Sequence, residues 1–445
     1  MKLNNTRTVL VGLAFLSICA FWQMYDNVIP LILKQTFHLD ETVSGLIMAS
    51  DNILALVLLP LFGALSDRIN TPIGRRMPFI LVGTAMAAVL MNILPMIDNA
   101  YAKRGGTFLM ALFVLVLGLL LVSMGVYRSP AVALMPDVTP KPLRSRANAI
   151  INLMGAVGGI IYLALAAVLF PDSKTAGVAH VNYQILFLIV SLLMVGSVAV
   201  LFLTIKEPKL AAEEREYELA HPEQQLTEDD GSGDAVLPKE VKRSLAFLLV
   251  SISLWFIGYN AVTTWFTVYV GEVMGQGIGG ASRCLLVATA GAIVSYIPIG
   301  HLASKIGRKK TIQCGIVLLA GCFALGFVLT TVYDHINAIM YVVFATVGFA
   351  WAAINVNSLP MVVEMCKGSD IGKFTGYYYT FSMAAQVVTP ILSGTLLKSV
   401  GYWTLFPYAA CFVAASFVTL LRVQHGDVKA EAKSGLAAYE AMDAD

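Results

Sequence analysis

Charge is scarce in this chain of 445 residues. Asp, Glu, Lys and Arg together make up 13% of the sequence, against roughly 25% in a typical soluble domain. Apolar residues make up 58%, and the mean hydropathy is +0.75. This composition excludes a soluble globular enzyme, a disordered chain and a nucleic-acid-binding protein. The formal net charge of +2 is too small to indicate a polyanionic partner.

The sequence also lacks the patterns that hold metals or nucleotides. Its six cysteines show no paired ligand spacing, and most lie in apolar runs, so we expect buried small side chains rather than disulfides or metal ligands. They are Cys19, Cys284, Cys314, Cys322, Cys366 and Cys411. No Walker loop is present, so ATP is not the expected energy source. We therefore expect no cofactor, no metal site and no catalytic residue, and hence a protein that is not an enzyme.

Long apolar runs account for most of the chain. Twelve of them, bounded by charged or turn residues, predict membrane-spanning helices. They cover roughly residues 8–33, 43–65, 77–97, 108–135, 147–170, 183–205, 244–270, 284–303, 311–333, 337–363, 374–397 and 402–421. Twelve spans of about 20 residues would use about 240 positions, which fits the apolar share. The first run is too long for the core of a signal peptide and no small-residue cleavage site follows it, so we count it as a span.

Lys and Arg predict the orientation of these spans. Twelve spans place both termini on one side, and 23 of the 30 Lys and Arg residues fall on that side, six on the other, and Arg128 inside a span. Because positively charged loops stay in the cytoplasm, we expect both termini there and a multi-pass protein of the cell (plasma) membrane. The lipid bilayer is then a partner of the whole chain, which we expect to be a monomer.

The polar stretch at 206–243 divides the chain. It begins with the helix-like AAEEREYELA and continues with TEDDGSGD, which predicts a short helix and then a flexible linker. The predicted organisation is an N-terminal six-helix bundle at 1–205, a cytoplasmic linker at 206–243, a C-terminal six-helix bundle at 244–422 and a cytoplasmic tail at 423–445.

The two halves repeat one another. GALSDR at 63–68 and GRR at 74–76 follow the second span, and GHLASK at 300–305 and GRKK at 307–310 follow the eighth. An acid and a base nine residues apart also recur, as Asp137 with Arg146 and, 227 positions later, as Glu364 with Lys373. The repeat predicts two pseudo-symmetric six-helix bundles in the same orientation, with a ligand site near mid-membrane at their interface.

These residues carry a family resemblance. The repeated G-x-x-S-D-R…G-R-R pattern resembles the loop motif of the major facilitator superfamily, over the whole chain. The longer forms GALSDRINTPIGRRMPFI and YRSPAVALMPD resemble the plant sucrose–proton symporters and their animal and bacterial relatives, the glycoside–pentoside–hexuronide-like group. The resemblance implies an all-α membrane protein with the twelve-helix major facilitator fold. It also implies a secondary transporter that works by alternating access.

The loop motifs predict a cytoplasmic gate. The arginines of each loop can reach the acid at the end of the fourth or tenth span, and such pairs would hold that side closed. The alternative is that these charges only anchor the topology. The expected gate residues are Asp67, Arg68, Arg75, Arg76, Asp137, Arg146, Lys305, Arg308, Glu364 and Lys373. We also expect Lys309 to reach Glu364. Ser304 replaces the family's aspartate in the second copy.

Charged side chains within the predicted spans are limited to Asp26, Asp51 and Arg128. A charge at mid-bilayer costs at least about 2.5–3.5 kcal/mol, so a function is expected, a structural salt bridge being the alternative. Asp26 and Asp51 come from antiparallel neighbouring spans at a similar depth, and two nearby carboxylates in a poor dielectric favour binding of a proton. They are therefore the expected proton-coupling residues. The plant symporters carry an acid three turns before the arginine, whereas Leu117 stands near that place here.

Polar and aromatic side chains inside the spans suit a sugar, which needs paired donors and acceptors and an aromatic face. The expected substrate-binding residues are Gln23, Tyr25, Asn27, Asn52, Arg128 and Asn152 in the first half, and Trp255, Tyr259, Asn260, Trp351, Asn355, Asn357 and Gln386 in the second. Trp22 lies one turn from Asp26 and shares its face. For any single aromatic residue, helix packing is the alternative. Unsatisfied amides in lipid are costly, which favours a function for the amide set.

The function predicted from all this is proton-coupled symport of a neutral sugar or glycoside, sucrose- or maltose-like. A proton is favoured over sodium because Ala55 and Leu59 occupy the places of the aspartates that melibiose-type relatives use. One alternative is a proton-driven exporter of drugs or metabolites, which would prefer bulky apolar substrates. A second is a non-transporting membrane receptor, which would need a signalling domain larger than the 206–243 segment.

Overall fold

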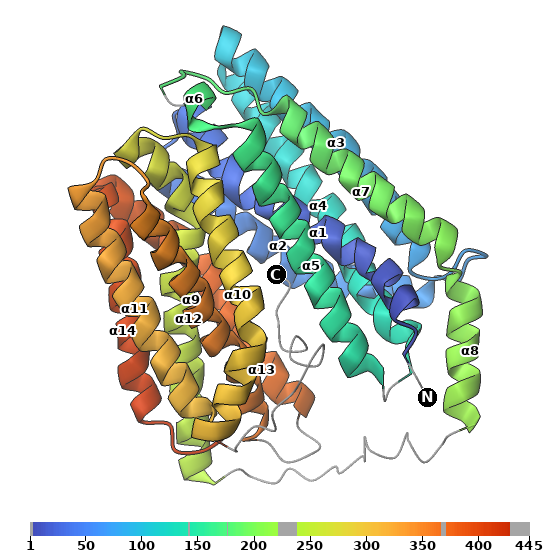
Figure 1. Cartoon of the computed structure of the whole chain (residues 1–445). Coiled ribbons are helices and arrows are strands. Elements are labelled where there is room, and N and C mark those ends of the chain that lie inside the picture. The colour runs from blue at the N-terminus through green and yellow to red at the C-terminus, as the bar shows by residue number, and fades with distance from the viewer. Residues whose placement is uncertain (1–2, 141–142, 176, 221–237, 366–370, 428–445) are drawn as a thin grey trace. The chain divides into compact units, whose positions relative to one another are not determined.

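The computed structural model describes residues 3–140, 143–175, 177–220, 238–365 and 371–427 (Figure 1). Over these ranges the backbone forms helices and their connections, without a β-strand. Most helices are apolar on every side. Their backbone N–H and C=O groups bond to one another within the helix, as a lipid environment requires. Asn4 and Asn337 begin two of the helices by accepting the otherwise unpaired N–H groups of Arg7 and Ile339, each at 3.0 Å.

Within the described ranges, twelve helices are long and apolar enough to cross a membrane. In the first half these are α1 with its π-helical extension η1 (Asn5–Leu31 and Ile32–Thr36), α2 (Glu41–Arg68), α3 (Met77–Arg104), α4 (Thr107–Asp137), α5 (Arg144–Leu169) and α7 (Gln184–Thr204). In the second half they are α9 (Lys239–Met274), α10 (Ile278–Ile306), α11 (Arg308–Val332), α12 (Ala338–Val363), α13 (Ile371–Ser399) and α14 (Leu405–Leu421), which η5 (Tyr402–Thr404) precedes. Two shorter helices are α6 (Asp172–Thr175) and α8 (Glu207–Ala220).

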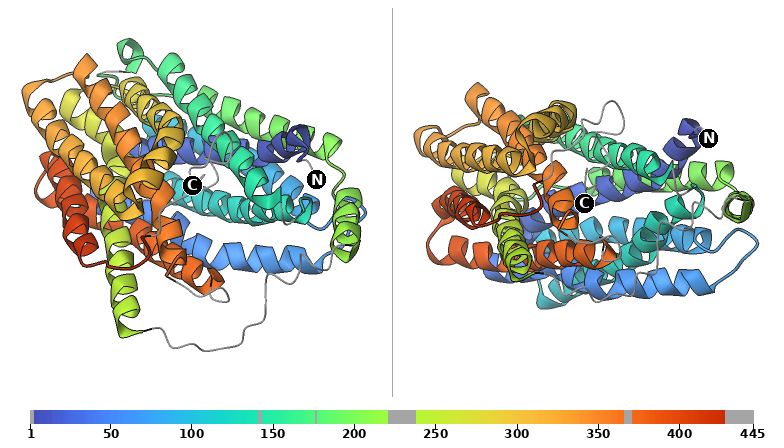
Figure 2. Two further views of the ribbon diagram at one scale, coloured as in Figure 1. Left: turned by 60° about the horizontal axis from the view of Figure 1, so that its bottom comes forward. Right: turned by 90° about the horizontal axis from the view of Figure 1, so that it is seen from below.

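The helices group into two compact units. Unit 1 contains α1, η1, α3 to α8 and α2 from Ser50 onward, and unit 2 contains residues 40–49 and α9 to α14. Within each unit the long spanning helices run roughly side by side, whereas α8 lies at an angle to them (Figure 2). We call the end that carries the repeated loops, residues 68–77 in unit 1 and 306–308 in unit 2, the motif end, and the opposite end the far end.

Close helix contacts hold each unit together. In unit 1, α1 packs on α5 and α7, and α3 packs on α4 and α7. In unit 2, α10 and α11 pack on α12, and α9 packs on α13 and α14. A Cβ atom at Gly158 would lie 1.9 Å from the carbonyl oxygen of Leu16, and one at Gly348 would lie 1.9 Å from that of Ala288. Glycine is therefore required at these two crossings, as in other close helix pairs in membranes.

The predicted spans match the helices, and the differences lie at their ends. The third helix continues to Arg104, seven residues past the predicted end, so Asp98 lies within it and is fully buried. Asp26, Asp51 and Arg128 do lie in spanning helices, but the expectation that charged residues are limited to these three was therefore wrong. The helix predicted after residue 206 is confirmed as α8, and α9 begins at Lys239. Residues 221–237 of the expected linker and 428–445 of the tail lie outside the described ranges.

The expectation for the cysteines holds only in part. Cys19, Cys284 and Cys322 are buried, as expected. Cys314 and Cys411 are exposed on the surface of α11 and α14, so burial was wrong for these two. An apolar run shows that a helix is in a membrane but not which of its faces meets its neighbours. Cys366 lies outside the described residues.

Candidate functional site

Three charged side chains from different helices of unit 1 lie near one another. Asp26 on α1 and Asp51 on α2 are each half-buried, and their carboxyl groups are close enough to interact electrostatically. Arg128 on α4 is within electrostatic range of Asp51. The structure thus brings together the charged residues that the sequence singled out.

Aromatic rings of α1 line the same place. The guanidinium carbon of Arg128 lies 5.8 Å from the centroid of the Trp22 ring, within the usual range of a cation–π contact. Trp22 meets Tyr25 edge to face at 5.5 Å between centroids. The phenol of Tyr25 is fully buried, and its hydroxyl makes no hydrogen bond within the described part of the chain. A buried hydroxyl of this kind is available to form a hydrogen bond with a ligand.

The amide side chains predicted to bind substrate in unit 1 differ in how free they are to form hydrogen bonds with a ligand. The side chain of Asn27 is buried and donates to the carbonyl oxygen of Gln23 at 2.6 Å, a bond within its own helix. Asn52 donates through its backbone N–H and its side chain to Oδ1 of Asp51, at 2.5 and 2.9 Å. Gln23 is half-buried beside Gly159 of α5, and Asn152 is buried on the same helix. Asn52 is therefore hydrogen-bonded to the carboxylate of Asp51. The bond of Asn27 lies within α1 and contributes to the structure of that helix.

Unit 2 contains an aromatic pair. The rings of Tyr259 on α9 and Trp351 on α12 stack at 3.7 Å between centroids, 5° from parallel. Phe256 meets Trp351 edge to face at 5.2 Å. Trp255 is fully buried, and its indole Nε1 makes no hydrogen bond with the residues described. The predicted aromatic residues of this half thus come together on two neighbouring helices.

Amides of unit 2 retain unused hydrogen-bonding groups. The buried Nδ2 of Asn260 and Oδ1 of Asn357 have no partner among the described residues. Nδ2 of Asn357 donates to the carbonyl oxygen of Ala353 at 2.9 Å, within α12. The hydroxyl of Tyr378 lies 3.5 Å from Oδ1 of Asn355, and Gln386 is half-buried on α13. Asn260 is therefore the amide of this half whose donor is most available to a ligand.

At the motif end of unit 1, two arginines share one carboxylate. Nη2 of Arg75 lies 2.7 Å from Oδ1 of Asp137, and Nε of Arg76 lies 2.7 Å from Oδ2. Arg76 also pairs with Asp67 and donates to Ser66 Oγ. The expected contact between the loop and the end of α4 is thus present, and Arg76, which is buried, is at its centre.

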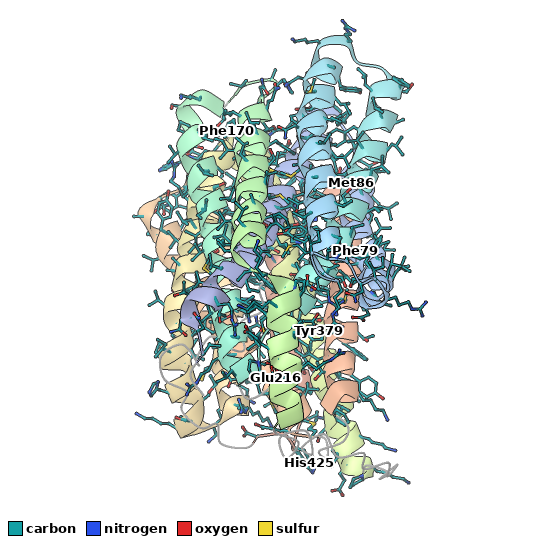
Figure 3. All side chains as sticks on the ribbon, turned by 90° about the vertical axis from the view of Figure 1, so that its right-hand side faces the viewer. Phe79, Met86, Phe170, Glu216, Tyr379 and His425 are labelled. Atoms are coloured by element: carbon teal, nitrogen blue, oxygen red, sulfur yellow. The ribbon has the colours of Figure 1, made fainter. Side chains whose placement is uncertain are left out.

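A third acid in this network, Glu207, was missed by the sequence analysis. Its carboxylate accepts the backbone N–H groups of Arg75 at 2.8 Å, Arg76 at 2.9 Å and Met77 at 2.8 Å. These are unpaired donors at the start of α3, whose own N-cap residue offers no acceptor. Figure 3 places Phe79 near this end of α3, Met86 further along it, and Glu216 on α8. The available signal was an acid followed by proline directly after the sixth span.

At the motif end of unit 2 the corresponding network is smaller. Nε of Arg308 lies 2.7 Å from Oε1 of Glu364. Ser304 bonds instead to the carbonyl oxygen of His301 at 2.8 Å. The expectation that Lys309 reaches Glu364 was wrong, because its ammonium bonds to the carbonyl oxygen of Val423 at 2.6 Å, past the end of α14.

Four other expected gate residues have exposed side chains at or near helix ends. They are Arg68, Arg146, Lys305 and Lys373. Exposed cations at these positions fit both a gate and a topological anchor, so their role stays a prediction.

Comparisons with known proteins identify the family and the fold. A family model described as Major Facilitator Superfamily matches residues 11–296 and 277–438. Among solved structures, that of the nucleoside transporter NupG matches with a TM-score of 0.63 at 14% identity, covering 94% of this chain and 98% of that chain. A bacterial homologue of the iron transporter ferroportin matches with a TM-score of 0.66 at 11% identity, covering 95% and 99%. At such identities the likeness shows the fold alone.

Curated relatives include plant proteins named for sucrose. Sucrose transport protein SUT2 of Oryza sativa subsp. indica is 27% identical over 252 residues, which is 52% of this chain and 48% of the rice protein. Sucrose transport protein SUC3 of Arabidopsis thaliana is 30% identical over 139 residues, which is 28% of this chain and 23% of the relative. The chain matches less than half the length of each of these relatives.

Proposed function

The chain belongs to the Major Facilitator Superfamily of multi-pass membrane transporters, and within that family we propose that it carries a neutral sugar or glycoside together with a proton. The observation that carries the proposal is the group formed by Asp26, Asp51 and Arg128 on three helices whose predicted spans hold no other charge. Charges inside a membrane protein persist where they serve an ion or substrate pathway. The names of the plant relatives support a sugar as the substrate.

We assign the proton to the two carboxylates. Asp26 and Asp51 interact with each other, and two neighbouring negative charges repel, so binding one proton relieves the repulsion. Arg128 lies within range of Asp51, which favours the charged form there. Asp26 is therefore the better carrier, and Asp51 tunes its affinity through their mutual repulsion.

Each unit by itself offers polar and aromatic side chains suited to recognising a sugar. Arg128 offers a planar set of N–H donors beside the Trp22 ring, and sugar hydroxyls and ring faces match these two features. Unit 2 supplies the stacked Tyr259 and Trp351 and the available donor of Asn260. A neutral, hydroxyl-rich ligand satisfies these groups better than a bulky apolar one, which distinguishes sugar symport from drug export.

We place the motif end in the cytoplasm, in the cell membrane, because 23 of the 30 Lys and Arg residues lie on that side of the predicted spans. The networks around Asp137 and Glu364 then act on cytoplasmic access during alternating access. Each network ties the loop between two helices to the end of a third, so breaking it loosens the motif end of its own unit. We take the monomer as the working unit.

The proposal is tested by uptake of a panel of radiolabelled sugars into proteoliposomes that hold the purified protein. An inward proton gradient should drive accumulation of at least one disaccharide or glycoside, and a protonophore should abolish it. Accumulation that follows a sodium gradient alone would overturn the proton assignment. If the proton gradient drives transport of apolar cations and no sugar accumulates, the protein is a proton-driven exporter and not a sugar symporter.

A further inference from the structure

A second group of polar side chains lies at the far end of unit 1. Its centre is His180, in the connection between α6 and α7. Nδ1 of His180 lies 3.2 Å from the hydroxyl oxygen of Thr36 on η1, and Nε2 lies 2.8 Å from Oδ1 of Asn99 on α3. Nε2 is also 3.8 Å from Oδ2 of Asp98. The imidazole therefore joins the end of the first span to the end of the third.

The hydrogen-bond partners determine which tautomer the neutral imidazole of His180 adopts. Asn99 donates through Nδ2 to Asn182 at 2.9 Å, so its Oδ1 faces the ring and can only accept. Nε2 must then carry the hydrogen, and Nδ1 accepts from the hydroxyl of Thr36. Burial lowers the pKa of His180, so this neutral form prevails at neutral pH.

Acidification changes each of these contacts. A protonated imidazole donates from both nitrogens, so the Thr36 hydroxyl must turn and become the acceptor. The new positive charge faces the carboxyl group of Asp98. The side chain of Asp98 is fully buried, whereas that of His180 is 24% exposed, so protons reach the pair through the histidine. Other titratable groups on the elements around His180 are Tyr101, Lys103 and Arg104 on α3, Lys34 on η1, Asp172 and Lys174 on α6, and Tyr183.

We propose that His180 and Asp98 form a proton-binding site, distinct from Asp26 and Asp51, that makes the far end of unit 1 respond to pH on its own side of the membrane. The ligand is a single proton, held between the imidazole and the carboxylate. Its binding alters the contact of Thr36, which ends the helix that carries Asp26, and the contact of Asn99, which lies near the end of α3.

Buried tyrosines connect this site with the centre of the unit. Tyr183 is close enough to Asp98 to interact electrostatically, and Tyr162 on α5 is close enough to both Tyr183 and Asp26. The Tyr162 ring is fully buried, and its hydroxyl has no hydrogen-bond partner in the described ranges. We expect a charge gained at His180 to influence Asp26 through these buried polar side chains. That consequence for transport rests on the proposed function, whereas the proton site itself does not.

The site is tested directly by histidine NMR on the full-length protein in detergent micelles. Protein labelled with ¹³C in its histidine rings is titrated from pH 4.5 to 8.5, and H180Q identifies the signal of His180. D98N should lower the His180 midpoint by about one pH unit or more, because an opposite charge about 4 Å away is removed. T36V should shift it, because the ring bonds to the Thr36 hydroxyl in both protonation states. An unchanged midpoint in both variants would overturn the site.

A matched control comes from the other unit. His335 forms a comparable pair with Asp334, at 2.8 Å, in a connection of the far end, but its side chain is 60% exposed and that of Asp334 is 96% exposed. D334N should leave the His180 midpoint unchanged. The signals of the five other histidines report whether D98N and T36V are folded. A variant that is unfolded changes all of these signals, whereas a local effect shifts the midpoint of His180 alone.

The response to pH is tested by transport. With external pH varied from 5 to 7.5 at a constant gradient, H180Q should lose the acid-dependent part of the uptake profile, while H335Q keeps it. A profile of H180Q that equals that of H335Q would overturn the regulatory role. Absence of sugar uptake in the unmodified protein would instead contradict the proposed function, and the NMR result would still decide the site.

Discussion

At the scale of single residues, the charges inside the helices carry the functional interpretation. Asp26, Asp51 and Arg128 were singled out because lipid penalises them, and the structure brings them together from three helices. The amides were less predictable. Asn27 and Asn357 each donate from Nδ2 to a carbonyl oxygen four residues earlier, which occupies a side-chain donor inside an apolar helix without any ligand. Asn260 and Tyr25, which have no such bond, are the stronger candidates.

Asp26→Asn should separate transport from coupling. An amide can still hydrogen-bond but cannot titrate, so the variant should lose proton-driven accumulation and keep exchange of labelled for unlabelled sugar. Both are measured in proteoliposomes, with the exposed Asp334→Asn as the control. Normal accumulation would transfer the coupling role to Asp51, and normal accumulation in Asp26→Asn and Asp51→Asn alike would exclude the carboxylate mechanism.

Arg128→Lys should impair uptake strongly, by about tenfold or more. An ammonium is a compact charge that reproduces neither the planar set of donors nor the stacking of a guanidinium on an indole, and Arg128 lies over Trp22. The rate of sugar uptake and the sugar concentration at half-saturation measure the effect. Lys209→Arg, a reciprocal exchange on an exposed part of α8, is the control. An Arg128→Lys variant with unchanged kinetics would show that a positive charge alone suffices.

At the scale of elements, the start of α3 depends on a side chain from another helix. Glu207→Gln removes the charge that three backbone N–H groups share. Hydrogen bonds to a charged group contribute about 1.5–3 kcal/mol each to stability, and the remaining amide oxygen keeps part of this. We expect a loss of about 1–3 kcal/mol in the free energy of unfolding, measured by denaturant titration in micelles. Glu216→Gln, exposed on the same helix, should leave stability unchanged.

The two loop networks should differ in strength. Asp67 pairs with Arg76 in the first network, whereas Ser304 at the equivalent place bonds to a backbone carbonyl, so Asp137→Asn should open the motif end more than Glu364→Gln. A loss of about 1–3 kcal/mol shifts the two access states by about five- to 150-fold. The measurement is the labelling rate, from each side of the membrane, of a cysteine introduced in the motif-end loop. Equal rates in Asp137→Asn and the unmodified protein would mean that these charges only set topology.

At the scale of the whole molecule, the prediction concerns orientation. In a variant without the exposed Cys314 and Cys411, a cysteine at Asp334 should react with an impermeant maleimide on intact cells. A cysteine at Lys209, whose side chain is 77% exposed, should react only after permeabilisation. The reverse pattern would place the basic loops outside, contrary to the distribution of Lys and Arg. Both positions are well exposed, so accessibility rather than burial decides the result.

The sequence by itself determined the number of spans, the repeat and the membrane class, because apolar length, repeated motifs and the distribution of positive charge are linear properties of the chain. It also identified Asp137 and Glu364 as partners of the basic loops, since equivalent spacing in two copies predicts equivalent contacts. Only the tertiary structure decided that Glu207 caps α3, that Lys309 turns to the end of α14, and that His180 meets Asp98. These contacts join residues far apart in the chain, 82 positions for the last pair, and no local period or spacing specifies which distant donor an acid will face.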